Sequence, residues 1–366
     1  MTNLPVLARE YNQHPIGGEQ VQQTLLAKAL ARRGYDATMV TSDYGQADGA
    51  TWDGVRTYKA FGLSEGLPGV RFFHPRWSGL WQAMRRARAD VYYTSCGGAV
   101  VGQAAMFCQR HGRKMVFRVA SDADCESHLP LIKYWRDKKL YEYGLRRADV
   151  VLVQSNYQHD LLMKNFGVES TIAGMLVEAA DTARTFYERD YQIVWVNNFR
   201  TLKRPDILLD AAAALPQLQF HMAGGAAPGY RKYYEDISQA ARAHGNVTVH
   251  GQVPYHEVNE YYERSCVLVN TSDIEGFPNS YLQAWMRGTP VVAFFDPDGL
   301  IAKEGLGIAV HTREQLIDAI RALATDPAVW KAASNRCIRF MEREFAEDKV
   351  LAPYRAAFDR LALAVN

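Results

Sequence analysis

Residues 266–295 have the sequence CVLVNTSDIEGFPNSYLQAWMRGTPVVAFF. The stretch begins and ends with short apolar runs rich in β-branched residues, which are typical of buried strands. Between these runs the sequence predicts a helix that begins at Asn279, a good N-cap residue, and ends at Arg287, where Gly288 closes it. A helix that joins two parallel strands is the crossover unit of an α/β sheet. The stretch therefore predicts a strand–helix–strand unit.

The same alternation of apolar runs and helical stretches continues along the whole chain. In the second half, helical segments separate five expected strands, which lie at residues 192–198, 218–224, 246–253, 266–272 and 289–295. In the first half we expect a helix at 19–33 and strands at 5–11, 36–42, 89–95, 113–121 and 148–155. This pattern favours an α/β fold built of doubly wound parallel sheets.

The length of the chain indicates two domains. It has 366 residues, of which 48% are hydrophobic, and single cores rarely grow beyond ~250 residues. We expect an N-terminal domain at 1–176, a linker at 177–190 and a C-terminal domain at 191–345. A last helical segment at 346–366 is expected to pack back on the N-terminal domain.

The charge of the chain limits the partners it could have. There are 42 basic and 40 acidic residues, a net charge of +2, which argues against a nucleic-acid-binding protein. Residues 1–175 nevertheless contain 22 Lys and Arg against 16 Asp and Glu, so this half could meet an anionic membrane surface. No apolar run approaches the ~20 residues of a spanning helix, and no secretory signal is visible. We therefore expect a cytoplasmic protein, peripheral to the inner face of the membrane.

Two loops that open helices carry glycines or cations. HPIGGEQ, at residues 14–20, contains Gly17 and Gly18, which would let the backbone approach an anion at a helix start. NNFRTLKRPD, at 197–206, places Arg200 and Lys203 where they could clamp a diphosphate. Each motif has a plainer interpretation, because a Gly-Gly pair before a helix is common and a basic turn is usually solvated.

The loop before the helix at 279–287 carries an acid. Glu275 follows a predicted buried strand, and Gln283 lies on the same helix face as Asn279, leaning back toward the helix start. An acid and an amide would thus converge beside a helix N-terminus, an arrangement that suits sugar hydroxyls and phosphate. The alternative is a capped core helix preceded by a surface glutamate.

The order of these motifs resembles that of a known enzyme family. GGEQ, then RxxK, then EGFPNSYLQAWMRGTPVV is similar to glycosyltransferase family 4, whose members are retaining GT-B enzymes of the glycogen synthase-like, group 1 type. The resemblance covers residues 5–365 and is stronger in the second half. It implies two Rossmann-like domains that face each other across a cleft, with the acceptor on the first and the nucleotide sugar on the second.

The resemblance also implies a role for each matching residue. Arg200 and Lys203 match the basic pair that binds the donor diphosphate and stabilises the leaving group, and Gly18 lets the first helix approach the same phosphates. Glu275 matches the acid that contacts the donor hexose, whereas the second acid, which binds the ribose, is here Gln283. The other residues implied in donor binding are Gly17, Val253, Gly276, Phe277, Pro278, Asn279 and Ser280.

Two Asp-x-Asp triplets could suggest a metal-dependent transferase. The triplet at 296–298 is better interpreted as a turn after a strand. Asp122 and Asp124 follow an expected N-terminal strand, where the family often places a histidine that faces the donor sugar. That histidine is missing here, so Asp122, Asp124 and the nearby His128 are weaker catalytic candidates, and no metal site is expected.

The activity implied is transfer of a hexose-type sugar, with retention, from a UDP- or GDP-linked donor to a hydroxyl of a glycan or polyprenyl-linked glycan. The expected setting is bacterial surface or exopolysaccharide biosynthesis. No cofactor or metal is needed, because cations and a helix N-terminus stabilise the departing diphosphate. The alternatives are a sugar-nucleotide epimerase or phosphorylase of the same architecture, or a two-lobed sugar-binding protein without catalysis.

One basic stretch has two interpretations. KYWRDKKLYEYGLRR, at residues 133–147, mixes basic and aromatic side chains. It could rest on anionic lipid head groups, or it could be an amphipathic core helix with a solvated basic face.

Overall fold

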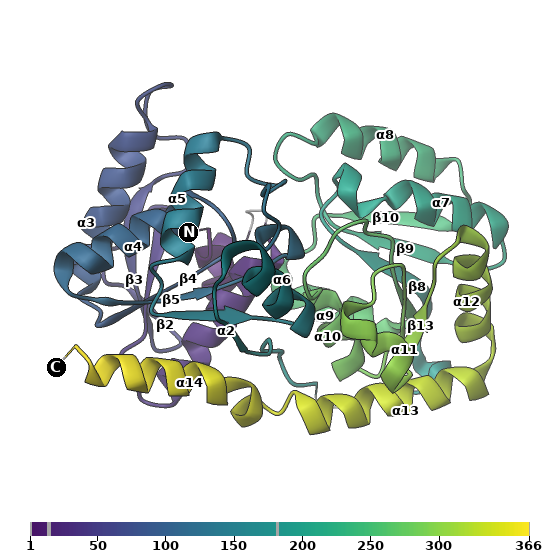
Figure 1. The fold of residues 1–366 in the computed structure, drawn as a ribbon. Coiled ribbons are helices and arrows are strands. Elements are labelled where there is room, and N and C mark those ends of the chain that lie inside the picture. Colours follow the sequence, from purple (N-terminus) through teal and green to yellow (C-terminus); the bar gives the residue numbers. More distant parts are fainter. Residues whose placement is uncertain (1, 13–15, 181–182, 366) are drawn as a thin grey trace. The chain divides into compact units, whose positions relative to one another are not determined.

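The computed structural model describes all residues except 1, 13–15, 181–182 and 366. The chain divides into two units (Figure 1). Unit 1 consists of Met1–Leu176 together with Glu347–Asn366, and unit 2 consists of Val177–Ala346. None of the helices in the described part of the chain combines the length and the hydrophobicity that are needed to cross a bilayer.

Unit 2 is built on one parallel sheet. Its strand order is β10-β9-β8-β11-β12-β13, and every neighbouring pair in it is parallel. The strands are β8 (Tyr191–Val196), β9 (Phe220–Ala223), β10 (Val247–Gly251), β11 (Ser265–Asn270), β12 (Val291–Ala293) and β13 (Gly307–Ala309). The chain runs outward from β8 in one direction and from β11 in the other, so the boundary between β8 and β11 is the switch point of a doubly wound sheet.

Helices cover both faces of this sheet. Buried side chains of α7 (Pro205–Ala214), α8 (Arg231–Arg242) and α12 (Arg313–Thr325) share one core with the strands. On the other side, α9 (Tyr255–Arg264) contacts β8 and β11, and α10 (Asn279–Met286) packs between α9 and α13 (Pro327–Glu344). The short α11 (Leu300–Glu304) joins β12 to β13. The five strands and the helices predicted for this half are therefore present, whereas α11 and β13 were not predicted.

Unit 1 contains two sheets. The larger has the order β4-β5-β6-β7 and is parallel throughout. It comprises β4 (Val91–Ser95), β5 (Lys114–Arg118), β6 (Val150–Val153) and β7 (Thr171–Ile172). The smaller sheet, β1-β3-β2, comprises β1 (Thr38–Asp43), β2 (Thr51–Trp52) and β3 (Val55–Gly62), with β2 antiparallel to β3. β3 lies beside β1 in this sheet and was not predicted from the sequence.

The helices of unit 1 include one that replaces a predicted strand. Residues 5–11 form α1 (Leu4–Leu7) and a 3-10 helix, η1 (Arg9–Tyr11), instead of a strand. Pro5 lies in the first turn of α1, where proline favours a helix start, and the consecutive apolar residues Leu4, Val6 and Leu7 are all buried. The remaining helices are α2 (Gly18–Arg32), α3 (Ser78–Ala87), α4 (Ala99–His111), α5 (Trp135–Leu145), α6 (Asn156–Phe166) and α14 (Glu347–Leu363), with the short η2 (Phe72–Trp77) and η3 (Asp122–Asp124).

The last helix, α14, completes unit 1 from a distant part of the sequence. Leu351, Tyr354 and Phe358 are buried, and the rings of Tyr354 and Phe358 contact Tyr93 of β4. The Tyr354 hydroxyl donates to the Gly174 carbonyl at 2.8 Å. The apolar side of α14 therefore closes one side of the core of unit 1.

Part of the predicted linker is packed structure. The segment at 186–188 forms a 3-10 helix, η4 (Phe186–Glu188), and the next residue, Arg189, is buried in unit 2. Its guanidinium donates to the carbonyl groups of Tyr262, Ser265 and Arg287. Because a buried cation needs such acceptors, Arg189 anchors this segment to unit 2.

Candidate functional site

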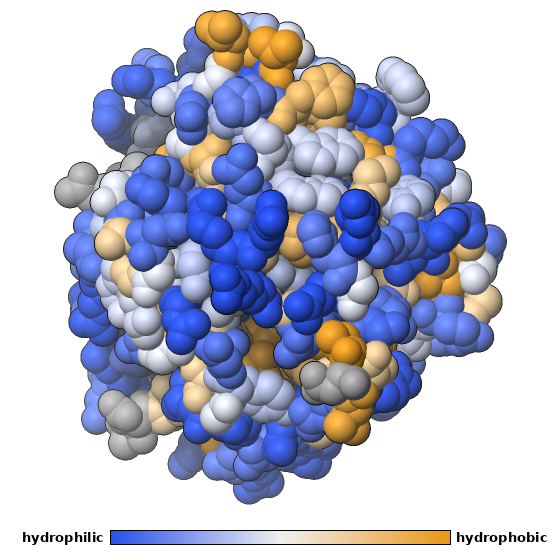
Figure 2. All heavy atoms as spheres, turned by 90° about the vertical axis from the view of Figure 1, so that its left-hand side faces the viewer, coloured by the Kyte–Doolittle hydropathy of each residue, from blue (hydrophilic) through white to orange (hydrophobic). Residues whose placement is uncertain are grey.

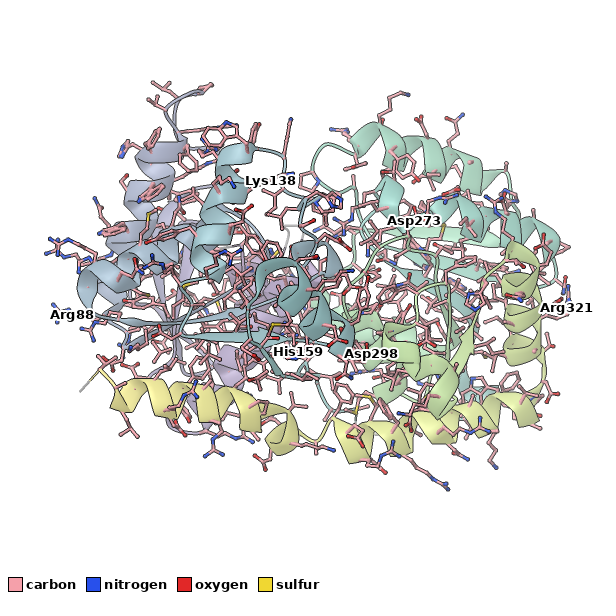
Figure 3. All side chains as sticks on the ribbon, viewed as in Figure 1. Arg88, Lys138, His159, Asp273, Asp298 and Arg321 are labelled. Atoms are coloured by element: carbon pink, nitrogen blue, oxygen red, sulfur yellow. The ribbon has the colours of Figure 1, made fainter. Side chains whose placement is uncertain are left out.

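The candidate site of unit 2 lies at the carboxyl ends of β8 and β11. The loop after β8 leads through η5 (Thr201–Lys203) to α7, and the loop after β11 leads to α10. Figure 3 labels Asp273 in the second of these loops. Because the two strands are neighbours at the switch point, the two loops meet at one edge of the sheet, where ligands of doubly wound sheets bind.

A buried ion pair joins the two loops. The Lys203 ammonium forms a salt bridge with the Glu275 carboxylate, and the two side chains are only 8% and 12% exposed. The Asn270 side chain also donates to Glu275, at 3.3 Å. Burial lowers the pKa of Lys203, and the nearby Arg200 lowers it further, whereas Glu275 opposes both effects. Two residues that the sequence predicted to bind a donor are thus brought into direct contact.

Backbone contacts hold the same loops in register. The Thr271 hydroxyl donates to the Lys203 carbonyl at 2.7 Å and accepts from the Trp195 indole at 3.0 Å. The Asp273 amide donates to the Leu202 carbonyl at 2.9 Å. These bonds tie the loop after β11 to the loop after β8 within a few residues of the ion pair.

Arg200 lies next to the ion pair. It precedes η5 with an extended backbone, and its Nε atom is buried with no hydrogen-bond partner in the part of the chain that the structure describes. A buried guanidinium N–H without an acceptor is costly, so this atom is suited to an acceptor that a ligand supplies. An anionic ligand would gain both Arg200 and Lys203 as partners.

The helix α10 begins beside Glu275. Its first residue is Asn279, and Pro278 occupies the N-cap position without a side-chain cap. The predicted N-cap was therefore one residue too late, and Asn279 is the first helical residue. Phe277 packs edge-on against Trp285 at 6.4 Å between ring centroids, which fixes the turn before the helix. Of the other predicted donor residues here, Gly276 is buried and Ser280 is half-buried in the first turn.

Gln283 contacts α9. The Gln283 side chain is 9% exposed and donates to the Asn259 side chain at 3.1 Å, and Asn259 donates to Glu178 at 3.0 Å. Among the described residues, the side-chain hydrogen bond of Gln283 thus runs toward α9 and not toward Glu275. Asn259 and Asn270 were not predicted from the sequence. The signal for Asn270 was a polar residue at the end of a strand in which every residue is buried.

Val253 lies farther along the same edge of the sheet. It follows β10 and is half-buried in the loop that leads to α9. β9 lies between β10 and β8 in the sheet, and the chain turns at Gly224 directly after it, where φ is +145°. A Cβ added to Gly224 would lie 1.8 Å from the Asn197 carbonyl oxygen. This close approach requires glycine and brings the loops after β8 and β9 together.

A cavity of about 450 Å³ lies next to the ion pair without containing it. Its lining includes Thr271, Ser272 and Asp273 together with Arg204 and Arg313. Both arginines are already paired with carboxylates, Arg204 with Asp206 and Asp273, and Arg313 with Asp210. The cavity therefore offers little uncompensated positive charge, in contrast to Arg200.

In unit 1, the loop that contains Gly17 is hydrogen-bonded to the first turn of α2, the helix that follows it. The Gly17 amide donates to the Gln20 side chain at 2.9 Å, and an added Cβ at Gly17 would lie 2.7 Å from that oxygen. Gly18 is exposed at the first position of α2. His14 and Pro15 of the motif lie outside the described residues. One amide that the motif was expected to offer to an anion is therefore engaged by Gln20.

The two acidic candidates of unit 1, Asp122 and Asp124, lie in the loop after β5 and form hydrogen bonds within unit 1. The Asp124 carboxylate is buried and accepts from the amides of Ala120 and Ser121 at 3.3 and 3.2 Å, and from the amide of Gly97. Burial raises the pKa of Asp124 to about 6 despite these donors. Asp122 accepts from the Gln158 side chain at 2.9 Å. The structure thus shows both carboxylates in contact with other parts of the unit, and His128 is exposed.

The second Asp-x-Asp triplet has a local role. The Asp296 carboxylate accepts from the amides of Ile301 and Ala302 at 2.7 and 3.2 Å, at the start of α11. It is therefore part of the turn predicted after β12. Within the described part of the chain, no group of three or more His, Cys, Asp or Glu residues is placed to hold a metal ion.

Comparison with known proteins gives two family matches. Residues 17–173 match the family described as "Glycosyl transferase 4-like domain", and residues 177–342 match "Glycosyl transferases group 1". Together the two matches cover most of the chain.

Curated relatives and solved structures are similar to the chain at lower identity. It is 27% identical to a D-inositol 3-phosphate glycosyltransferase of Kribbella flavida over 46% of this chain and 44% of that protein. It is 29% identical to a protein of the same name from Geodermatophilus obscurus, over 47% and 42%. The matched region thus spans less than half the length of these relatives.

Among solved structures, sucrose-phosphate synthase from Thermosynechococcus elongatus superposes with a TM-score of 0.75 at 19% identity, covering 96% of this chain and 97% of that one. Anabaena HepE in complex with UDP and glucose superposes with a TM-score of 0.73 at 13% identity, covering 94% and 96%. At these identities the likeness concerns the fold, which is of the GT-B type.

Proposed function

Because this chain belongs to the group 1 glycosyltransferases, we propose that it transfers a hexose-type sugar, with retention, from a nucleoside diphosphate sugar to an acceptor hydroxyl. The observation that carries this proposal is the buried contact between Lys203 and Glu275 at the switch point of unit 2. A cation and an acid from two loops meet there beside the start of a helix, and such a site suits a ligand that contains both phosphate and sugar hydroxyls.

The chemistry follows from the charge that the reaction creates. The bond between the anomeric carbon and the diphosphate oxygen breaks, and the acceptor oxygen forms a bond to the same face of that carbon. The acceptor proton passes to the departing diphosphate. The protein's part is to stabilise the growing negative charge, which Lys203, Arg200 and the first amides of α10 would do in a desolvated place.

Glu275 would hold the donor sugar. A carboxylate accepts hydrogen bonds from hydroxyl groups and positions them. When the donor binds, the diphosphate would compete with Glu275 for Lys203, which frees carboxylate oxygens for the sugar. We propose that Arg200 and Lys203 contact the diphosphate, that Val253 lies beside the base, that Gln283 binds the ribose, and that Gly276, Phe277, Pro278, Asn279 and Ser280 surround the sugar and the phosphates.

The finer identity of the substrates forms part of the proposal. We propose a UDP- or GDP-linked donor, and a glycan or polyprenyl-linked glycan acceptor in bacterial surface or exopolysaccharide biosynthesis. The complex of HepE with UDP and glucose supports a nucleotide sugar for this fold. No metal enters this reaction, because two cations and a helix N-terminus supply the positive charge.

The first test is nucleotide binding. We expect UDP or GDP to raise the midpoint of thermal unfolding, with an unchanged shift in EDTA, whereas ADP serves as the matched nucleotide control. If no nucleoside diphosphate stabilises the protein, the proposed donor site is wrong. A panel of nucleotide sugars then identifies the donor, and NMR of the product reads the anomeric configuration.

Products separate the proposal from its alternatives. An epimerase would return an altered nucleotide sugar without any acceptor, and a phosphorylase would need inorganic phosphate instead of a nucleotide. A sugar-binding protein without catalysis would bind a sugar and release no nucleoside diphosphate. Release of nucleoside diphosphate that depends on the acceptor is expected here.

A further inference from the structure

Unit 1 exposes a group of large apolar side chains in two short segments. Within the first, Leu67 is 73% exposed, Val70 56% and Phe73 63%, and within the second, Trp135 is 78% exposed. Such side chains are usually covered, and a cluster of them marks a contact surface. We name the group the apolar tip; its members are Leu63, Leu67, Val70, Phe73, Leu131, Tyr134 and Trp135.

The two segments form one surface. The Arg136 guanidinium lies over the Phe72 ring at 3.5 Å, and Phe72 contacts Phe73 edge-on at 5.2 Å between ring centroids. Figure 1 shows the loop before α3 and the first turn of α5 at the same end of unit 1. Figure 2 shows apolar side chains gathered at that end, on a face that is otherwise mostly hydrophilic.

The loop that carries the first segment is built by its own hydrogen bonds. The Gly62 amide donates to the Glu65 carboxylate at 2.7 Å, and the Arg71 amide donates to the Leu67 carbonyl at 2.8 Å. Its apolar side chains are therefore presented outward by a folded turn.

Cations dominate the charge around the apolar tip. Arg71 and Lys133 are exposed within the two segments, and Lys138 and Lys139 follow on α5; Figure 3 labels Lys138. Of the acids nearby, Glu65 caps its own turn, Asp137 pairs with Arg136 at 2.8 Å, and Glu142 pairs with Lys139 at 3.0 Å. Among the described residues here, the cations that keep their charge uncompensated are therefore Arg71, Lys133 and Lys138. The surface thus combines aliphatic and aromatic side chains with uncompensated positive charge.

The other basic stretches of this unit lack the apolar component. Arg85, Arg86 and Arg88 lie at the far end of α3, and Figure 3 labels Arg88 away from Lys138. A purely basic surface would bind any polyanion, whereas apolar side chains among cations match a lipid interface. Tyrosine and tryptophan in particular favour the head-group level.

We infer that the apolar tip docks unit 1 on a bilayer that contains anionic lipids. Leu67, Val70, Phe73 and Trp135 enter the boundary between head groups and acyl chains, and the cations stay at the lipid phosphates. The loop after β5, which holds Asp122 and Asp124, leads directly to Leu131 and Tyr134. This inference goes beyond the proposed transfer reaction, since no donor residue takes part in it.

The test is co-sedimentation of the full chain with vesicles of phosphatidylcholine, with and without phosphatidylglycerol. We expect the anionic vesicles to bind at least tenfold more tightly than the neutral ones. The double variant Leu67→Ser/Trp135→Ser should lose at least tenfold in binding to anionic vesicles. The matched control, Tyr187→Ser/Val329→Ser, removes two exposed apolar side chains of unit 2 and should bind as the unchanged protein does.

The charge component has its own pair of variants. Arg71→Gln/Lys133→Gln should weaken binding to anionic vesicles by about fivefold to thirtyfold, and Arg85→Gln/Arg88→Gln should change it less than twofold. Each variant is first shown to unfold at the same temperature and to retain its thermal shift with nucleotide, so a failed donor site is distinguished from a failed membrane contact.

Three results would overturn the inference. The first is that the unchanged protein does not sediment with anionic vesicles. The second is that the Leu67→Ser/Trp135→Ser variant sediments as well as the unchanged protein does. The third is that this variant converts a dimer to a monomer in analytical ultracentrifugation, which would make the apolar tip an interface between two copies of the chain.

Discussion

Lys203 and Asp124 occupy similar places in the two units, but their charged groups bind different kinds of partner. Each lies in a loop after a parallel strand, and each is less than a tenth exposed. Lys203 is paired with Glu275, a side chain from a different loop. Asp124 instead accepts from backbone amides of its own loop and of the loop after β4.

The difference shows which edge is open to a ligand. A side-chain ion pair can exchange one partner for a phosphate, because both groups keep lone pairs or protons for a second contact. A carboxylate that holds backbone amides cannot be released without loss of the loop conformation. The ion pair of unit 2 could therefore exchange a partner for an anionic ligand, whereas the carboxylate of the unit 1 loop stabilises the conformation of its own loop.

The largest expected effect is on catalysis at Lys203. We expect Lys203→Met to lower kcat/KM by roughly 10²- to 10³-fold, as the loss of a group that stabilises leaving-group charge does. Arg204→Met is the matched control, because Arg204 is the neighbouring cation but pairs with Asp206 and Asp273 at the surface. The kcat/KM of Arg204→Met should stay within about threefold of that of the unchanged enzyme. Equal losses in both variants would contradict the assignment of Lys203.

The next effect concerns stability at Asp124. Asp124→Ala leaves three backbone amides without their acceptor, and we expect a loss of about 3 kcal/mol in the free energy of unfolding by urea titration. The kcat of the folded fraction should change less than threefold. A loss of turnover with unchanged stability would instead place Asp124 at the reacting sugar.

The pH dependence of the free energy of unfolding is a second test of the role of Asp124. Because burial raises the pKa of Asp124 to about 6, the folded state favours the protonated carboxyl. Its stabilising contribution is complete below about pH 4 and is lost as pH rises through 6, by at most about 3 kcal/mol. Asp124→Asn removes this titration. The difference in the free energy of unfolding between the unchanged protein and Asp124→Asn should therefore change between pH 4 and pH 7 and be constant above pH 7.

A smaller effect is expected at Gln283. Gln283→Ala should raise the KM for the donor about fivefold, the value of one neutral hydrogen bond, and leave kcat within twofold. Asn259→Ala is the control, because it removes the partner of Gln283 on α9 without removing the amide itself. If Asn259→Ala raises KM as much as Gln283→Ala does, Gln283 acts through α9 and not through the ribose.

The smallest expected effect is the change in unfolding free energy when the exposed salt bridges between Arg33 and α14 are removed. Arg33 forms salt bridges with Glu347 and Asp348, whose side chains are 42% and 84% exposed. We expect Arg33→Ala to cost less than about 1 kcal/mol in unfolding free energy, and nothing in 1 M salt. A larger cost would show that charge, rather than the buried residues Leu351 and Tyr354, holds α14 in place.

The sequence predicted unit 2 better than unit 1, for a physical reason. Strands that are buried on both faces consist of continuous apolar runs, as in β8 and β11, and such runs are easily recognised. β3 carries exposed and half-buried residues, and α1 is only 4 residues long, so neither has a clear period. At residues 5–11 the choice of a strand was wrong, because Pro5 and the packing of Leu4 and Leu7 favour a helical turn.

The candidate site was predicted by residue type but not by contact. Lys203 and Glu275 are 72 residues apart, and their contact depends on β8 and β11 being neighbours, which no local pattern shows. The engagement of Gln20 with Gly17 and of Asp124 with three amides depends on loop conformations that the sequence does not reveal. The roles of the predicted site residues themselves remain predictions.

The return of the chain to unit 1 has a consequence for its synthesis. Unit 2 is continuous from Val177 to Ala346, whereas unit 1 needs residues from Glu347 onward to complete it. On the ribosome, the last core residues of unit 1, including Leu351, Tyr354 and Phe358, emerge after all of unit 2. The part of the chain that is translated first is therefore the last to close its core, and until then the face of β4 that carries Tyr93 is open to chaperones.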